Sequence, residues 1–132
     1  MKNIGTKNIK INIRRIKMKI NEWLKKTYST VGTGDIYDFN EDPFINIRPL
    51  ITCNDGFSMS VQASFGHYCI PRITLKDGNY ESVEIGFPNM VEQLILEYAE
   101  NKSNPIDSVY GYVPVMIVDR IIEKHGGIVN EL

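Results

Sequence analysis

The chain contains little of what defines several large classes of protein. Among its 132 residues are only two cysteines, Cys53 and Cys69, so a disulfide-stapled scaffold is not expected. It has no continuous run of about eighteen apolar residues, which a membrane-spanning helix requires. Its first residues lack the apolar core and the small-residue cleavage site of a secretory signal. We therefore expect an intracellular globular protein whose two thiols are buried or half-buried.

Charge is distributed unevenly along the chain, although the net charge is only −1. Residues 1–17 contain six lysines and arginines and no acid, which gives +6. Residues 18–132 contain the other nine basic residues and all sixteen acidic ones, which gives −7. We therefore expect a basic N-terminal extension over residues 1–17 and a single acidic domain over residues 18–132, with Met1 or Met18 as the natural start. Direct nucleic-acid binding is not expected except through the extension, because phosphate neutralisation requires Lys and Arg.

Alternation of apolar and polar residues predicts several strands. In residues 57–64, the apolar side chains fall on one face and the polar ones, among them Ser60 and Gln62, on the other. The preceding Asp55-Gly56 is a hairpin signal, because Gly56 can adopt the positive φ that the turn requires. Further strands are expected over residues 45–53, 80–87 and 109–112. The pattern predicts a small antiparallel sheet of three or four strands in a hairpin meander.

Helical spacing occurs on both sides of these strands in the sequence. Residues 20–26 predict a short N-terminal helix that Trp23 anchors to the core. Residues 88–100 predict a surface helix with its glutamates pointing outward, and a last helix is expected between Pro114 and Gly126. The expected fold class is therefore α+β, with the two C-terminal helices packed on one face of the sheet. An apolar alternation within residues 9–13 can pair with a sheet edge, so a homodimer and a monomer both stay open.

An acidic segment with aromatic residues between its carboxylates is the first candidate site. The residues expected to bind a partner are Asp35, Tyr37, Asp38, Phe39, Glu41 and Asp42. The ligand spacing and the mid-loop glycine of an EF-hand are missing, so a solvated loop is favoured over a calcium site. As an alternative to a merely solvated loop, the rings supply buried area and the carboxylates steer a basic protein partner towards the surface.

The end of the strand over residues 57–64 is the second candidate site, because several reactive and polar side chains follow it closely. The residues of the alternative, ligand-binding site are Gln62, Ser64, His67, Tyr68 and Arg72. The planar fork of Arg72 suits a carboxylate or a phosphate. A simpler interpretation is that Arg72 pairs with the acidic surface while His67 and Tyr68 cover the edge of the core.

Catalysis and metal binding are weakly supported by the same residues. His67 and Cys69 share a face of an extended chain, but no third group that would orient a Cys-His pair is evident. Two cysteines and two histidines match the ligand count of zinc, yet their spacing fits no compact finger. His125 is better placed as a cation at the C-terminus of the last helix. We therefore expect no catalytic residue, no metal ligand and no cofactor.

A set of short motifs resembles a known group of sequences. MKINEWLKK, YDFNEDPF, MSVQAS with HYCIPR, VEIGFP, VYGYVP and EKHGGI together are similar to a family of small uncharacterised phage and prophage proteins from Firmicutes and related gut bacteria. The resemblance covers residues 18–128 and carries no assigned functional residues. It implies a mobile-element context, in which small acidic proteins, anti-CRISPR and other anti-defence proteins among them, act by binding.

The expected function follows from this context together with the charge. It is inhibition of a host defence effector, such as a CRISPR nuclease, through a basic surface of that effector, in the cytoplasm of a bacterial host cell. The first alternative is a protein that sequesters a small molecule or nucleotide in the His67 to Arg72 region. The second is a small enzyme that depends on Cys69.

Overall fold

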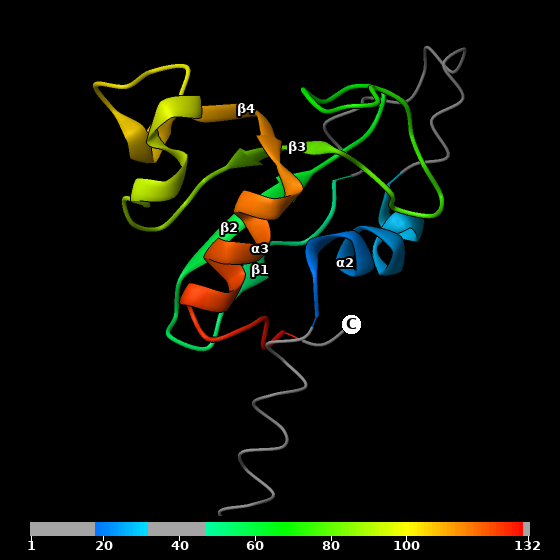
Figure 1. Ribbon diagram of the computed structural model, residues 1–132, viewed down its shortest axis with the longest axis horizontal. Coiled ribbons are helices and arrows are strands. Elements are labelled where there is room, and N and C mark those ends of the chain that lie inside the picture. Colours follow the sequence, from blue (N-terminus) through cyan, green and yellow to red (C-terminus); the bar gives the residue numbers. More distant parts are fainter. Residues whose placement is uncertain (1–17, 32–46, 131–132) are drawn as a thin grey trace, which may run out of the picture.

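The computed structural model describes residues 18–31 and 47–130 of the chain (Figure 1). Within these residues, four strands form one antiparallel sheet in the order β1-β2-β3-β4. The strands are β1 (Ile51–Thr52), β2 (Ser58–Gln62), β3 (Ser82–Gly86) and β4 (Val109–Pro114). The sheet follows α2 (Ile20–Lys26) in sequence and precedes α3 (Val115–Lys124). The expected α+β meander is therefore confirmed.

Both helices share one hydrophobic core with the sheet. Trp23 of α2, Met59 of β2 and Ile121 of α3 are fully buried in the same cluster. Figure 1 shows α3 directly after β4 with α2 beside it, and a hydrogen bond of 2.8 Å from the Ile20 backbone N–H to Asp119 Oδ1 joins the two helices. The prediction that Trp23 anchors the first helix is confirmed.

Two turns contain a glycine with positive φ, and the one at Gly56 lies where the sequence predicts it. Gly56, between β1 and β2, has φ +91°, and Gly78, between residues 64–72 and β3, has φ +68°. Gly78 also lies against α2, because a Cβ at this position would come within 2.5 Å of the Lys25 backbone nitrogen. The absence of a side chain at Gly78 is thus needed for both the turn and the contact with α2.

The pairing of β3 with β4 is irregular at its centre. Val83 lies opposite Val113 and Ile85 opposite Tyr110, so that two residues of β4 face Glu84. This β-bulge gives Tyr112 a φ of +55°, which is uncommon for a bulky side chain. It turns one end of β4 relative to the other and shapes the surface described below.

Three segments differ from the sequence expectations. The segment expected as a surface helix over residues 88–100 contains instead the 3-10 helix η2 (Gln93–Tyr98), and Glu92 just before it is 1% exposed rather than outward-facing. Of the strand expected over residues 45–53, the described part, residues 47–53, contains only the short strand β1, and Arg48 before it is buried. The polar face of β2 is also covered, since Ser60 and Gln62 are nearly inaccessible. In each case a partner from a distant part of the chain covers the polar side chain.

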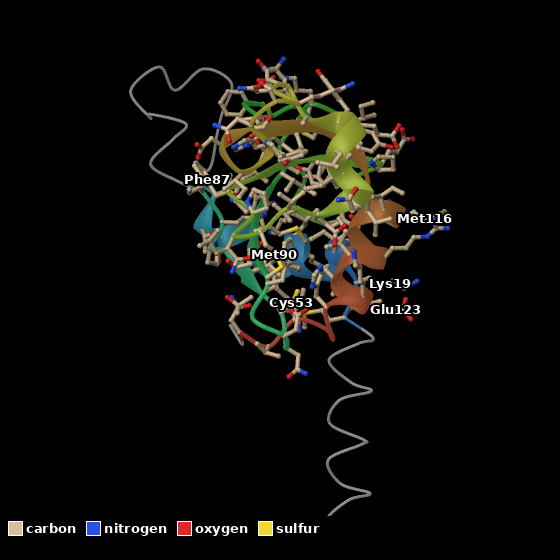
Figure 2. The ribbon with its side chains drawn as sticks, turned by 90° about the vertical axis from the view of Figure 1, so that its left-hand side faces the viewer. Lys19, Cys53, Phe87, Met90, Met116 and Glu123 are labelled. Carbon is tan, nitrogen blue, oxygen red and sulfur yellow. The ribbon has the colours of Figure 1, made fainter. Side chains whose placement is uncertain are left out.

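Among the described residues, large exposed apolar side chains occur at several places on the surface. Phe87 is 76% exposed and Met116 is 65% exposed, and they project from separate places on the surface (Figure 2). Scattered exposed apolar residues are normal in folded proteins. The exposure of these side chains does not by itself identify a binding surface.

Candidate functional site

The segment after β2 crosses the sheet beside the bulge of β4. The backbone N–H of Tyr112 donates to the carbonyl of Tyr68 at 3.1 Å, and the N–H of Tyr68 donates to Glu84 Oε1 at 3.1 Å. Farther along, Ile70 pairs with Ser82 at the start of β3. These bonds hold Tyr68 over the irregular part of the β3-β4 pair.

His67 bonds within this segment and is not exposed to a ligand. Its Nδ1 lies 2.6 Å from Ser64 Oγ, and that oxygen accepts the N–H of Gly66 at 3.1 Å. The hydroxyl hydrogen of Ser64 is therefore free to point at Nδ1, which suits a neutral imidazole. Burial, helped by the nearby guanidinium groups of Arg48 and Arg72, lowers the pKa of His67 to about 4. Hence His67 is a neutral, internally bonded histidine near neutral pH.

Neither thiol is activated for nucleophilic chemistry. Cys69 Sγ lies 3.2 Å from the carbonyl oxygen of Ser64 and 3.4 Å from that of Pro71, and burial raises the pKa of this thiol. Burial and the neighbouring Asp55 carboxylate raise the pKa of Cys53 to about 11. Reactive cysteines require a lowered pKa and some exposure. The structure gives both cysteines the opposite environment.

Gln62 holds a buried arginine that sequence reasoning missed. Its side-chain Oε1 accepts the backbone N–H of Arg48 at 2.9 Å, and its Nε2 donates to the backbone carbonyl of Arg48 at 2.9 Å. The guanidinium of Arg48 donates to Thr27 Oγ1 at 2.9 Å, to the Ala63 carbonyl at 2.5 Å and to the Leu24 carbonyl at 3.3 Å. Arg48 is 1% exposed, and burial lowers its pKa. No sequence pattern marks this residue, because its partners lie in α2 and β2 or directly after them.

Tyr68 and Arg72 are the members of the predicted ligand-binding set that remain at the surface. Tyr68 is 40% exposed, whereas Gln62, Ser64 and His67 are buried. The guanidinium carbon of Arg72 lies 5.3 Å from the centre of the Tyr68 ring, within the range of a cation-π contact. Arg72 Nε also donates to the Phe65 carbonyl at 3.2 Å. The structure thus brings Tyr68 and Arg72 together and directs the other three into internal bonds.

An open hollow of about 250 Å³ lies next to Tyr68. Its lining comes from three parts of the chain and consists of Tyr68, Tyr98, Ala99, Glu100, Gly111 and Tyr112. We call this feature the tyrosine hollow. The rings of Tyr68 and Tyr112 are 5.9 Å apart between centroids and tilted by 39°. Gly111 permits this packing, since a Cβ there would lie 3.3 Å from the Cβ of Tyr68.

The tyrosine hollow has a negative border. Glu100 is exposed at its edge, and the half-buried Glu84 accepts the N–H of the lining residue Tyr68. Burial raises the pKa of Glu84, and the nearby charge of Glu100 adds to that effect. Sequence analysis named Tyr68 but not Tyr98 or Glu100 as site residues, because Tyr98 and Glu100 lie about thirty residues after Tyr68 in the sequence.

A second polar cluster joins the β1-β2 turn to the C-terminus of α3. His125 Nδ1 lies 2.6 Å from Asp55 Oδ2, its Nε2 lies 2.8 Å from Glu92 Oε1, and its ring stacks on Phe57 at 4.2 Å. Lys124 Nζ reaches Glu92 Oε1 at 2.9 Å. Each nitrogen of the His125 ring therefore lies within hydrogen-bond distance of a carboxylate oxygen. The predicted position of His125 at the end of the last helix is confirmed.

The His125 cluster is a structural connection rather than a ligand site. Its imidazole separates the two carboxylates instead of leaving a common point between them. Over residues 18–31 and 47–130, no group of three or more His, Cys, Asp or Glu side chains is arranged to hold a metal ion. The side chain of Glu92 also accepts the backbone N–H of Leu94 at 2.8 Å and so caps the start of η2. The cluster therefore ties together the hairpin, η2 and α3.

The first candidate site lies outside the described residues. This holds for all six of its members, Asp35, Tyr37, Asp38, Phe39, Glu41 and Asp42, and also for the basic extension over residues 1–17. Among the helices that the structure does describe, none combines the length and apolarity needed to cross a membrane. No family model, no curated protein and no solved structure matches the chain.

Proposed function

We propose that this chain is a phage or prophage protein that inhibits a host defence effector, such as a CRISPR nuclease, by occupying a basic surface of that effector. The observation that carries the proposal is the tyrosine hollow with Glu100 at its edge, in a chain whose residues 18–132 have a net charge of −7. Tyrosine rings supply contact area with few rotatable bonds, and negative charge speeds association with a basic protein. The proposed setting is the cytoplasm of a bacterial host, in line with the sequence motifs that resemble phage proteins.

The acidic segment over residues 35–42 extends the same proposal. Four of the acids responsible for the negative charge, Asp35, Asp38, Glu41 and Asp42, lie within these eight residues. Tyr37 and Phe39 between them repeat the combination of ring and carboxylate found at the tyrosine hollow. We propose that this segment supplies the electrostatic steering, which depends on total charge more than on detailed geometry.

The alternatives have less support from the geometry. A small-molecule site built on Gln62, Ser64 and His67 would have to break the internal bonds that these side chains make with Arg48 and with one another. A Cys-dependent enzyme would need a thiolate, whereas burial raises the pKa of Cys69. Protein binding uses side chains that are already exposed, so it requires no rearrangement.

The test is inhibition of target-DNA cleavage by a panel of purified CRISPR nucleases. The full chain is added at increasing molar ratio, and we expect cleavage by at least one effector to stop near equimolar amounts. The triple change Asp38→Lys, Glu41→Lys and Asp42→Lys should weaken inhibition by at least about tenfold, because like charges then face the basic surface.

A matched control has the same change in total charge. Glu81, Glu97 and Glu123 are exposed and lie outside the tyrosine hollow, so replacing all three by Lys alters charge but not the proposed surface. We expect this control to keep most of the inhibition. Equal effects of the two triple variants would contradict a role for residues 35–42, and a panel in which no nuclease is inhibited would contradict the proposed target class.

A further inference from the structure

The geometry points to the tyrosine hollow as a docking site for an arginine side chain of the protein partner. This inference rests on the proposed function for the identity of the partner, but the chemistry of the site can be tested without it. The lining combines three tyrosines, Tyr68, Tyr98 and Tyr112, with the carboxylate of Glu100. The faces of aromatic rings are negative, and a carboxylate at their border adds to the attraction for a cation.

The charges near the hollow select a cation over an anion or a neutral group. Glu100 is exposed at the edge, and Glu84 holds the backbone N–H of Tyr68 beside it. Burial raises the pKa of Glu84, repulsion from the charge of Glu100 raises it further, and the charge of Arg72 acts in the opposite direction. A bound cation relieves that repulsion, whereas a phosphate or carboxylate would increase it.

One of these rings already receives a guanidinium. Arg72 places its guanidinium carbon 5.3 Å from the centre of the Tyr68 ring, although Arg72 does not line the hollow. Arginine is favoured over lysine at such a place because its planar, weakly hydrated group stacks on rings and can also bond a carboxylate with two N–H groups. Glu100 is the carboxylate available for that purpose.

The size of the hollow suits a single side chain. Its volume is about 250 Å³, whereas sites for drug-sized ligands and cofactors measure about 300–1,000 Å³. A nucleotide or a folded cofactor would therefore extend well outside it. The open form of the hollow instead fits a side chain that a partner protein presents from its own surface.

The backbone at Tyr112 gives an independent reason to regard the hollow as functional. Tyr112 has φ +55° at the bulge of β4, and its ring is 46% exposed. A bulky residue in this conformation costs free energy, and such strain is concentrated at binding sites. Phe87, which does not line the hollow, has a similar φ of +52°, so the strain supports the site only together with the gathered rings and carboxylate. Glycine would adopt the same φ at no cost, so replacing Tyr112 by glycine removes the ring without adding backbone strain.

The test is an NMR titration of the isotope-labelled full chain with N-acetyl-L-arginine amide. We expect the rings of Tyr68, Tyr98 and Tyr112 and the side chain of Glu100 to shift together with a millimolar dissociation constant. The corresponding lysine amide should bind more weakly. Shifts that are spread evenly over the acidic surface, or equal responses to arginine and lysine, would overturn the inference.

Two variants and one matched control make the titration specific. Tyr112→Gly removes the ring and suits the positive φ, so we expect a folded protein that no longer binds the arginine amide. Glu100→Gln should weaken binding by about fivefold. Glu123→Gln makes the same change in charge at an exposed position on α3 and should change binding less than about twofold. Similar effects of the two Glu→Gln changes would refute a local role of Glu100.

The same variants distinguish this inference from the proposed function. If the arginine amide binds at the tyrosine hollow while no nuclease is inhibited, the site is established and the proposed function fails. If a nuclease is inhibited equally by the wild-type chain, by Tyr112→Gly and by Glu100→Gln, the arginine site is refuted, and inhibition then depends on another surface such as residues 35–42 rather than on the tyrosine hollow.

Discussion

Mild acid should destabilise this protein through the protonation of His67. The ring is 8% exposed, and its pKa in the folded protein is about 4, whereas an unfolded histidine titrates near 6.5. Between these two pH values the unfolded chain holds more protons than the folded one, so the free energy of unfolding rises with pH. The contribution of neutral His67 to the free energy of unfolding is therefore complete above about pH 6.5 and is lost as the pH falls towards 4.

The size of this effect follows from the two pKa values. A pKa difference of one unit corresponds to about 1.4 kcal/mol, so the change in pKa from 6.5 to about 4 limits the loss in the free energy of unfolding to about 3 kcal/mol. Integration of the proton difference gives a loss of about 2 kcal/mol between about pH 7.5 and pH 5. Such a loss is a large fraction of the stability of a typical domain, about 5–15 kcal/mol.

Urea denaturation at several pH values measures this contribution. The single tryptophan, Trp23, is fully buried, so its fluorescence reports unfolding directly. The wild-type chain is compared with His67→Gln, which cannot titrate, and the difference between their unfolding free energies is plotted against pH. His125 and the carboxyl groups are present in both proteins, so their contributions cancel. A difference that stays constant from about pH 7.5 to pH 5 would refute the argument.

Two further substitutions test the packing around the site by the same unfolding assay. Arg48→Ala should lower the free energy of unfolding by roughly 3 kcal/mol or more, because three buried oxygens lose their donor, while Arg120→Ala on the exposed face of α3 should change it by less than about 0.5 kcal/mol. A small effect of Arg48→Ala would show that water replaces the guanidinium. Gly78→Ala should cost more than about 1 kcal/mol, since its Cβ would lie 2.5 Å from a backbone nitrogen of α2 at a φ of +68°. Gly86→Ala, where a Cβ meets nothing within 4 Å, is the control, and equal losses for the two glycines would contradict the close contact.

The local elements could be predicted from the sequence because their signals are carried by neighbouring residues. Apolar spacing over seven residues was sufficient to locate α2, and Gly56 was sufficient to locate the β1-β2 turn. The end of α3 was marked in the same way by Gly126, which has φ +88° just after His125. Such signals depend on the φ preferences of single residues and on the period of a helix or strand.

The tertiary structure decided which polar side chains are buried and which rings gather. An alternating pattern indicates two faces of a strand but not whether a second segment covers the polar one, so the burial of Gln62 beneath Arg48 was missed. The helical pattern of residues 88–100 placed Glu92 in solvent. Its burial depends on His125, which lies thirty-three residues away in the sequence, so the local pattern could not indicate it. The tyrosine hollow required a bulge in β4 that brings Tyr68, Tyr98 and Tyr112 to one place. Contacts between residues so far apart in sequence depend on chain packing, which no local pattern records.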